Sequence, residues 1–462
     1  MLALLLLACA SPEPAAPPDD PVLTAPSPVA QPNLLVLVLD DVGADSLAVT
    51  NTGFFDQYPS TPNLDALASE GVIFRNAWSN PTCTPSRASM LLGRTAWRNG
   101  TGNAVAVPAD WHLPPGTDTV AVALSRAGYA TAAIGKWHLG EQFRDGYPVP
   151  DDGWGFAHSA GTIGNLGPKG NPYADPLVGY YHYLHHEDGQ AEYVWGYATT
   201  RVVDDTLDWL AEAPEPWFGW VAFQAAHAPF QPPPPELVTH AVTATSADYA
   251  LYGATIEALD AEIGRLLAGI DPAQRARTTV MVVGDNGIPF SLLPAPLSQQ
   301  SKGTTYQLGI HVPLFVAGAS VAGGGRESDA LVSLTDVAAT LTTLGHNPLP
   351  QIDGQDFSAI LTDPSAAGPR ELVFSQQFIP NFDPAAPLPA FLTSGHAVRD
   401  ARYKLREVWT HVGYTERSLY DLAADPWEET DLLIAPTPEN LAIGRRLRDA
   451  LDQEFSESPV PR

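Results

Sequence analysis

Three runs of consecutive apolar residues constrain the fold more than any other feature of the sequence. They span residues 33–39, 217–223 and 278–283 and consist mostly of leucine, valine and aromatic side chains. A short apolar run without alternating polar residues is typical of a strand that is buried on both faces. Such strands occur in parallel sheets that helices cover on both sides. The sequence therefore predicts an α/β fold built on a large, mostly parallel sheet flanked by helices.

Amphipathic segments between and after these runs favour helices. The segment 61–71 has a proline near its start and a glycine at its end, which are common helix boundaries. Further helices are expected over 198–210, 255–267 and 333–344. A chain of 462 residues is long enough for one large domain and a smaller one.

Shorter β-like runs replace the long buried ones after residue 369. They include 371–374 and 403–408, and a helix is expected over 437–455. We interpret residues 33–368 as the large domain. Residues 369–462 are interpreted as a smaller α+β domain, with a small antiparallel sheet and one helix packed on it.

Two adjacent carboxylates, Asp40 and Asp41, come directly after the first buried run. Carboxylates at the end of a buried strand are costly unless a cation neutralises them. The carboxyl ends of parallel strands are also where ligands bind in open α/β sheets. Hard divalent cations such as Ca²⁺ and Mg²⁺ prefer oxygen ligands. The alternative, one acid capping a helix and the other solvated, would be favoured if the motif stood alone. The third run ends similarly, in Asp285 and Asn286.

The turn at residues 83–87, Cys-Thr-Pro-Ser-Arg, precedes a run of small and apolar residues that favours a helix. Cys83 and Arg87 would then lie about one helical turn apart on the same face. Both would be near the positive N-terminal end of the helix dipole, where anions bind. The turn therefore predicts a site that binds an anion and attacks it.

The charge of the chain limits its partners. Its formal net charge is −28, from 52 acidic and 24 basic residues, which argues against nucleic acid and anionic membrane surfaces as partners. An anionic substrate must then be captured by a local basic pocket. Lysines are scarce, so each one is informative: Lys136, Lys169, Lys302 and Lys404.

The N-terminal segment 1–9 is apolar and ends in Leu-Leu-Ala-Cys. It is too short to span a bilayer and resembles a bacterial lipobox, in which Cys9 would be lipidated. Residues 10–32 are rich in proline and alanine and are expected to form a disordered tether. An ordinary secretory signal peptide is the alternative. Both interpretations predict export, and the lipobox further predicts a periplasmic or cell-surface lipoprotein of a bacterium. A disulfide between Cys9 and Cys83 is disfavoured because Cys9 lies in the targeting segment.

Two motifs identify the chain as similar to a known family. Residues 83–87 match the motif in which a cysteine is converted to formylglycine, and residues 128–138, Gly-Tyr-Ala-Thr-Ala-Ala-Ile-Gly-Lys-Trp-His, match a second signature. The chain resembles the formylglycine-dependent sulfatases, of the arylsulfatase type, in the alkaline phosphatase-like superfamily. The resemblance extends from Asn33 to about Asp431. It implies a maturation enzyme that generates formylglycine as a partner.

The resemblance also implies a set of metal ligands and a set of catalytic residues. The metal, Ca²⁺ in preference to Mg²⁺, would be held by Asp40, Asp41, Asp285 and Asn286, with Cys83 facing its remaining positions. Cys83, as the hydrated aldehyde, would attack sulfur and later expel sulfate. The resemblance further implies that Arg87 and His138 orient the hydrate, and that His138 also aids the release of sulfate. Lys136 and Lys302 would bind sulfate oxygens. His227 would protonate the leaving alcohol.

The sequence departs from the family pattern in two places near these residues. Ala226 stands where a proline usually precedes the histidine. In the segment that begins with Lys302, the residues Gln307, Leu308 and His311 replace a glutamate, a glycine and an arginine. Lys302 itself is retained, so we expect its contact with the anion to persist with a different supporting structure.

Residues 141–195 have weak periodicity and are expected to form a long irregular segment that shapes substrate access. His182, His185 and His186 could be interpreted as a second metal site, but their spacing matches no strong ligand pattern. The expected activity is hydrolysis of a carbohydrate or aryl sulfate ester. The alternatives are hydrolysis of phosphate or phosphonate monoesters, and a surface lipoprotein that binds sulfated glycans without turnover.

Overall fold

The computed structural model describes most of the chain, namely residues 31–105, 113–114, 116–140, 153–167 and 179–456. The predicted signal segment 1–9 and nearly all of the tether 10–32 lie outside the described residues, so both stay predictions. Among the described helices, none is long and apolar enough to cross a membrane.

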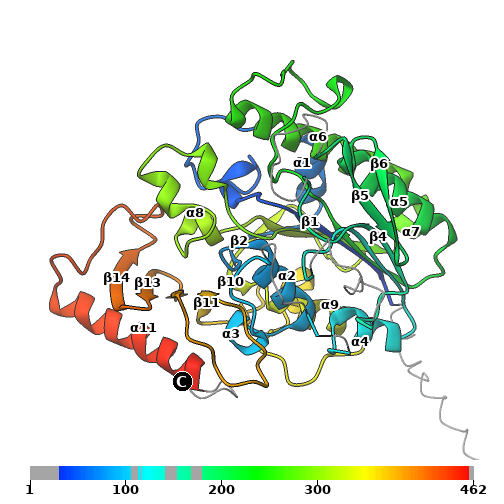
Figure 1. The fold of residues 1–462 in the computed structure, drawn as a ribbon. Coiled ribbons are helices and arrows are strands. Elements are labelled where there is room, and N and C mark those ends of the chain that lie inside the picture. The colour runs from blue at the N-terminus through cyan, green and yellow to red at the C-terminus, as the bar shows by residue number, and fades with distance from the viewer. Residues whose placement is uncertain (1–30, 106–112, 115, 141–152, 168–178, 457–462) are drawn as a thin grey trace, which may run out of the picture. The chain divides into compact units, whose positions relative to one another are not determined.

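The described residues form one large sheet of ten strands, shown in Figure 1. In spatial order its strands are β10 (Arg326–Ser333), β2 (Val72–Trp78), β9 (Leu314–Gly318), β8 (Thr278–Gly284), β1 (Asn33–Leu39), β7 (Trp217–Ala222), β3 (Ala130–Lys136), β4 (His158–Thr162), β5 (His182–Glu187) and β6 (Gln190–Trp195). The five strands from β8 to β4 pair in parallel, as do β10 and β2. The other neighbours are antiparallel. The sheet is thus mixed and mostly parallel, as predicted.

Helices cover both faces of the large sheet because the side chains of its strands alternate between two apolar clusters. In β1, residues 35, 37 and 39 pack on the side of α1 (Pro62–Ser69), α5 (Ala198–Glu212) and α6 (Asp248–Gly269). Residues 34, 36 and 38 pack on the side of α2 (Cys83–Leu92), α4 (Val120–Arg126), α9 (Asp336–Leu344) and α10 (Ser358–Thr362). Figure 1 shows α1 and α6 on one side of the sheet and α2 and α9 on the other.

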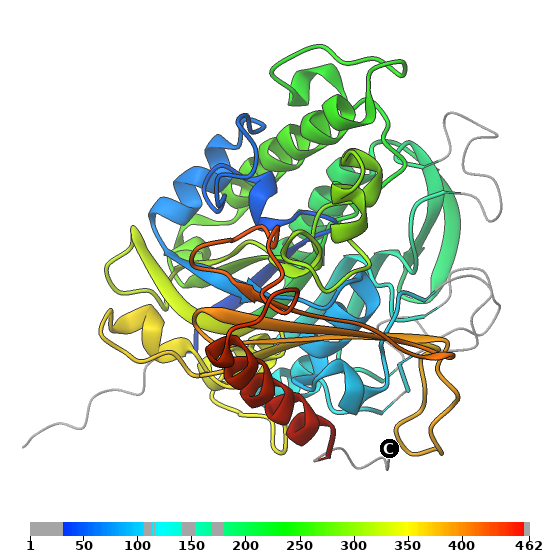
Figure 2. The same ribbon diagram turned by 90° about the vertical axis from the view of Figure 1, so that its left-hand side faces the viewer.

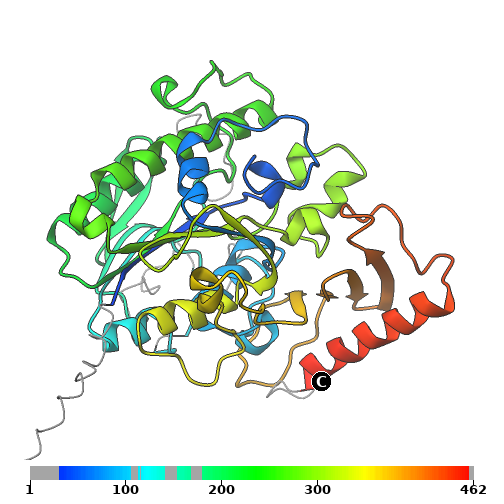
Figure 3. The ribbon, with the colours of Figure 1, turned by 180° about the vertical axis from the view of Figure 1, so that it is seen from behind.

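A second sheet of four antiparallel strands lies in the C-terminal part of the chain. It consists of β11 (Val373–Ile379), β12 (Thr393–Arg399), β13 (Tyr403–Thr410) and β14 (Gly413–Asp421). The helix α11 (Pro438–Ser456) packs Leu447 and Leu451 against Val398 and Leu405 of this sheet. Figures 2 and 3 show α11 beside the small sheet from two directions. The antiparallel sheet and its helix are confirmed, and the boundary between residues 368 and 369 stays a prediction.

The remaining α-helices of the described residues are short. They are α3 (Ala96–Asn99), α7 (Pro272–Arg275) and α8 (Gln307–Ile310). The three predicted buried strands correspond to β1, β7 and β8, and the predicted helices correspond to α1, α5, α6, α9 and α11 with shifted ends.

The prediction of an irregular segment over 141–195 is wrong in part, and its residues 141–152 and 168–178 lie outside the described residues. Residues 158–162 form β4, and residues 182–195 form the β5–β6 hairpin, which extends the large sheet. The two turn residues of the hairpin, Asp188 and Gly189, have φ angles of 43° and 78°. Positive φ at both positions is the geometry that matches the twist of a two-residue hairpin, and Asp-Gly favours it.

Replacing Leu37 by alanine tests the central position of β1. Leu37 is fully buried, so Leu37→Ala is expected to lower the free energy of unfolding by about 3 kcal/mol through lost burial and a cavity. The matched control is Leu441→Ala on α11, where the side chain is 42% exposed and the expected change is within about 0.5 kcal/mol. Urea unfolding followed by circular dichroism measures both, and equal losses would contradict this placement of the core.

Candidate active site

All the predicted site residues gather at one edge of the large sheet. The strands β8, β1, β7 and β3 are neighbours and run in parallel, so their carboxyl ends meet there. These ends supply Asp40, Asp41, Lys136, His138, His227, Asp285 and Asn286, while Cys83 and Arg87 come from α2 and Lys302 comes from the segment before α8. The order of the strands therefore explains why residues distant in sequence come together.

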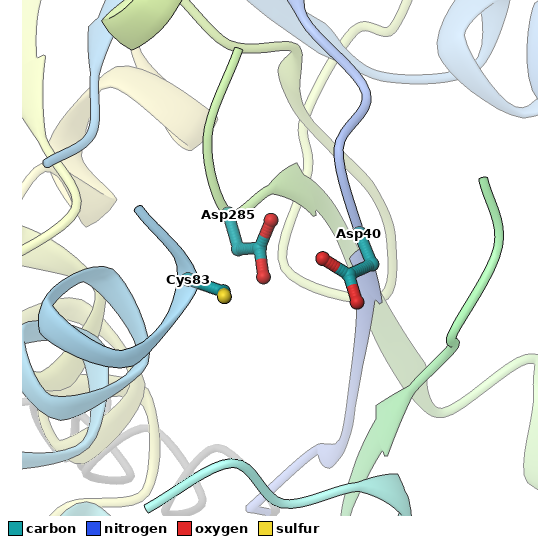
Figure 4. Close-up of side chains that lie close together, drawn as sticks. All are labelled: Asp40, Cys83 and Asp285. Atoms are coloured by element: carbon teal, nitrogen blue, oxygen red, sulfur yellow. The ribbon is translucent and has the colours of Figure 1, made fainter. Parts of the chain in front are cut away.

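Cys83 is the first residue of α2, and Arg87 lies one turn further along, as predicted. The turn before the helix is closed by Ser86, whose hydroxyl accepts a hydrogen bond from the backbone N–H of Asn80 at 3.0 Å. The Sγ atom of Cys83 lies 3.1 Å from Nδ1 of His138. Figure 4 shows the side chains of Cys83, Asp285 and Asp40 pointing toward a common space.

Arg87 connects α2 to the ends of two strands. Its Nε and Nη2 atoms lie 2.9 Å and 2.8 Å from Oδ2 of Asp285, and its Nη1 donates to the carbonyl oxygen of Lys136 at 2.6 Å. Both Arg87 and Asp285 are fully buried. Burial disfavours the charge of Arg87, but Asp285 and Asp40 together raise its pKa.

Two lysines contact the carboxylates that follow β1. The ammonium group of Lys136 contacts Asp40, and that of Lys302 contacts Asp41. Burial opposes the ionisation of Asp40, yet Lys136, His227 and Arg87 hold its pKa well below the usual range. These three neighbours therefore favour the anionic form of Asp40.

Asp285 differs from Asp40 because it faces another carboxylate. Burial and the charge of Asp40 raise the pKa of Asp285 to about 6, although Arg87 acts in the opposite direction. One oxygen of Asp285 also accepts a hydrogen bond from the backbone N–H of Asp41 at 3.2 Å. Carboxylates packed this closely favour a nearby cation.

The surroundings of the two histidines of the site favour their neutral forms. Burial lowers the pKa of His138 well below its ordinary value, and the charges of Lys136 and Arg87 add to the effect. Burial also lowers the pKa of His227. Nδ1 of His227 lies 2.6 Å from the carbonyl oxygen of Ala228, so this nitrogen carries the proton. Nε2 of His227 then faces Asp41, at 3.8 Å from Oδ2.

Two buried oxygen atoms of the site have no hydrogen-bond partner among the described residues. They are Oδ1 of Asp40 and Oδ1 of Asn286. The Nδ2 atom of Asn286 donates to Asp41 at 2.8 Å, which turns Oδ1 of Asn286 to the other side. Ligand atoms of Asp40, Cys83 and Asp285 also lie within 4.8 Å of one another. The residues present therefore fit a hard cation that takes oxygen ligands.

A cleft of about 940 Å³ opens above these residues. Asp41, Cys83, His227 and Lys302 line its inner end. Its walls are mostly apolar and aromatic, and they include Tyr181, Pro229, Phe230, Pro289 and Phe290. Such walls suit a ligand that carries an apolar or ring-shaped group.

The unusual residues of the segment after Lys302 are all engaged in the fold. The backbone N–H of Gln307 donates to Glu428, and Nε2 of His311 lies 2.9 Å from the carbonyl oxygen of Arg75. Leu308 packs in an apolar cluster with Ile288. None of these three side chains displaces Lys302 from Asp41.

Sequence reasoning missed one residue that supports the site. The hydroxyl of Tyr252, in α6, donates to the carbonyl oxygen of Asp41 at 2.9 Å and lies 2.7 Å from the hydroxyl of Ser46. Asp41 has a φ of 60°, a left-handed conformation that aspartate adopts more readily than most residues. No local motif marks Tyr252, whose partner is 211 positions away in the sequence.

The three histidines of the β5 region do not form a metal cluster among the described residues. His185 pairs with Asp205 at 2.9 Å, and the ring of His182 stacks on Trp195 with centroids 4.0 Å apart. Tyr181, just before β5, does line the cleft.

Comparisons with known proteins agree with this geometry. The family described as Sulfatase matches residues 32–346. Arylsulfatase G of Rattus norvegicus is 29% identical over 417 residues, which cover 81% of this chain and 75% of that protein. N-acetylgalactosamine-6-sulfatase of Homo sapiens is 31% identical over 351 residues, which cover 69% of this chain and 62% of that protein.

Solved structures share the fold at lower identity. Ps i-CgsB in complex with k-i-k-neocarrahexaose has a TM-score of 0.72 at 20% identity, over 92% of this chain and 93% of that chain. BT4656 in complex with its substrate D-glucosamine-2-N,6-O-disulfate has a TM-score of 0.71 at 18% identity, over 93% of this chain and 99% of that chain. The match of the family to more than half of the sequence shows that the chain belongs to the sulfatases, hydrolases of sulfate esters in the alkaline phosphatase-like superfamily.

Proposed function

We propose that the chain releases sulfate from an organic sulfate ester with residue 83, in its formylglycine form, as the nucleophile and a divalent cation beside it. The observation that carries this proposal is the position of Cys83. Its sulfur lies at the start of α2, between His138 and the carboxylates of Asp40 and Asp285. A hydrated aldehyde at this position has one hydroxyl that can attack sulfur and a second that can expel sulfate afterwards.

The charges of the site explain how an acidic chain captures an anionic ester. Three carboxylates, Asp40, Asp41 and Asp285, face three permanent cations, Arg87, Lys136 and Lys302. A divalent cation, when bound, would leave this balanced site with a net positive charge. It would also lower the pKa of a nearby hydroxyl and neutralise charge on the sulfate oxygens. We propose Ca²⁺, with Mg²⁺ as the alternative, held by Asp40, Asp41, Asp285 and Asn286 and facing residue 83.

The neighbouring side chains have separate roles in this proposal. Arg87 and His138 orient residue 83, and neutral His138 can take a proton from its second hydroxyl when sulfate leaves. Lys136 and Lys302 bind sulfate oxygens, since both ammonium groups already lie at the inner end of the site. These contacts are fixed before the substrate arrives, which favours stabilisation of the transition state.

His227 stands at the inner end of the cleft, where the alcohol would leave. The carbonyl oxygen of Ala228 holds the proton on Nδ1, so Nε2 is the nitrogen that faces the leaving oxygen. Nε2 passes on a proton only after His227 has taken one up from solvent and become an imidazolium, a form that Asp41 at 3.8 Å favours. The apolar and aromatic walls support a substrate whose ring packs against Phe230 and Phe290, either a sugar or an aryl group. One relative is named for a sugar sulfate, and BT4656, which shares the fold, is in complex with a sugar sulfate as its substrate; both support the sugar.

Removing His227 tests the proposed activity and the exit of the alcohol. We expect His227→Ala to lower kcat/KM about 100-fold to 1000-fold for a sugar sulfate, because its alkoxide needs a proton to leave. The loss for 4-nitrophenyl sulfate should stay below about tenfold, since nitrophenolate leaves without one. Sulfate release measured by ion chromatography gives both values.

The matched control is His240→Ala, because His240 is an exposed histidine outside the cleft and should leave both rates unchanged. Equal losses on the two sulfates in His227→Ala would contradict the proton-donor role. Faster turnover of 4-nitrophenyl phosphate than of the sulfate by the unsubstituted enzyme would favour the phosphatase alternative over the proposed function.

Removal of the cation tests the proposed ligands independently of catalysis. Ca²⁺ added to the chelator-treated chain should stabilise it by about 3 kcal/mol at a hundred times its dissociation constant, because only the folded chain assembles the ligands. The shift of the thermal unfolding midpoint measures this effect. Asp40→Asn should abolish most of the shift, whereas Asp336→Asn, a buried acid paired with Arg370 away from the site, should preserve it. An equal shift in both variants would rule out Asp40 as a ligand.

A further inference from the structure

The short helix α8 is a junction on which three loops of the site converge. The backbone N–H of Ser79 donates a hydrogen bond to the carbonyl oxygen of Ile310 at 2.8 Å. In the same way, the N–H of Gly287 donates to the carbonyl oxygen of Gly309 at 2.9 Å, and the N–H of Ala44 donates to the carbonyl oxygen of His311 at 3.0 Å. Ser79 precedes the turn of Cys83, Gly287 follows Asn286, and Ala44 follows the loop of Asp41. The helix α8 and His311, the residue directly after it, thus contact the backbone of every loop that carries proposed metal ligands or the proposed nucleophile.

Lys302 is tied to the same junction from the other side. Its backbone N–H donates to the carbonyl oxygen of Ile288 at 2.9 Å, and the N–H of Gly303 donates to Pro81 at 2.8 Å. The N–H of Ile288 in turn donates to the carbonyl oxygen of Leu308 at 3.0 Å. The position of the Lys302 ammonium group, which contacts Asp41, therefore depends on the position of α8.

The contact between α8 and the loop after β8 leaves no spare room. A Cβ atom added to Gly287 would lie 1.9 Å from the carbonyl oxygen of Leu308. Backbone atoms packed this closely transmit a displacement rather than absorb it. A small shift of α8 would consequently move the loop that carries Asp285 and Asn286.

The C-terminal part of the chain holds the first turn of α8. The N–H of Gln307, the first residue of α8, donates to the carboxylate of Glu428, which is 3% exposed. The other oxygen of Glu428 lies 2.7 Å from Nζ of Lys404, a fully buried lysine of β13. This ammonium group also lies 4.9 Å from the centroid of the Trp78 ring, at the end of β2. The buried pair thus connects the small sheet to the loops of the active site.

The carboxylate of Glu428 satisfies a backbone N–H group at the start of α8. The first N–H groups of a helix have no partner within the helix, and an acceptor, best an anion, satisfies them. A buried anion needs a counter-ion, which Lys404 supplies. The charges of Glu428 and Lys404 are both buried beside the N–H group of Gln307. A neutral acceptor would satisfy this N–H group at a lower desolvation cost.

From these contacts we infer that Glu428 is a positioning residue of the active site. Glu428 fixes α8 through the N–H of Gln307, and α8 fixes the loops of Asp41, Cys83 and Asp285. The C-terminal sheet thereby determines the geometry of a site to which it contributes none of the proposed ligands. The effect on turnover rests on the proposed function, whereas the effect on the loops does not.

Two double variants separate the hydrogen bond from the buried charge. Glu428→Gln with Lys404→Met and Glu428→Leu with Lys404→Met both replace the ion pair by neutral side chains of similar size. Only the glutamine retains an acceptor for the N–H of Gln307. Hydrogen exchange is measured by mass spectrometry on chain that still carries unmodified Cys83, so the readout needs no turnover.

We expect the leucine variant to exchange at least about tenfold faster than the glutamine variant at the amides of Ala44, Ser79 and Gly287. The amides of the β5–β6 hairpin should exchange equally in both. In matured enzyme the leucine variant should lose about 100-fold in kcat, as expected for displaced reacting groups, and the glutamine variant should stay within about threefold of the parent. Equal exchange at the three amides in both variants would overturn the inference.

A single variant covers the case in which the leucine variant does not fold. Gln307→Pro removes the donor and leaves Glu428 and Lys404 in place, and proline is tolerated at the first position of a helix. Tyr306, the preceding residue, has a ψ of 160°, which suits a residue before proline. Faster exchange at the same three amides supports the inference, and unchanged exchange overturns it. If no variant and no parent enzyme hydrolyses a sulfate ester, the proposed function fails while the exchange result still decides the role of Glu428.

Discussion

The buried ion pair between Arg87 and Asp285 is the interaction on which the rest of the site depends. It joins the first turn of α2 to the end of β8, and Arg87 also holds the carbonyl oxygen at the end of β3. Both partners are fully buried, so loss of either would leave an uncompensated charge, at a cost of about 3–5 kcal/mol. The pair therefore fixes Cys83, four residues before Arg87, against the strand ends that carry Asp40 and His138.

The charges around this pair are arranged so that each anion faces a cation. Lys136 contacts Asp40 and Lys302 contacts Asp41, while two oxygens, of Asp40 and Asn286, remain without a hydrogen-bond partner among the described residues. Such an arrangement can bind a divalent cation and an anionic ester together, because the charge of each offsets the charge of the other inside the buried site. In a chain whose formal net charge is −28, these local cations offset the repulsion that the rest of the chain exerts on an anionic ester.

Local patterns in the sequence predict the buried strands and the residues at their ends. The apolar runs 33–39 and 278–283 predict β1 and β8, and strand ends predict where Asp40 and Asp285 meet. The hairpin over 182–195 was missed although Asp188-Gly189 signals it, because the flanking residues alternate poorly in hydrophobicity. Glu428 could not be found from sequence, since its contact with Gln307 joins residues 121 positions apart and depends on how β13 packs beside α8.

The most direct test of the account is the chemical state of residue 83. Trypsin releases the peptide from Asn76 to Arg87, and its mass is measured in protein purified from the native host. The account predicts a peptide that has lost one sulfur and two hydrogens and gained one oxygen, the change from cysteine to formylglycine. An unmodified thiol at residue 83 in protein that releases sulfate would contradict the proposed nucleophile.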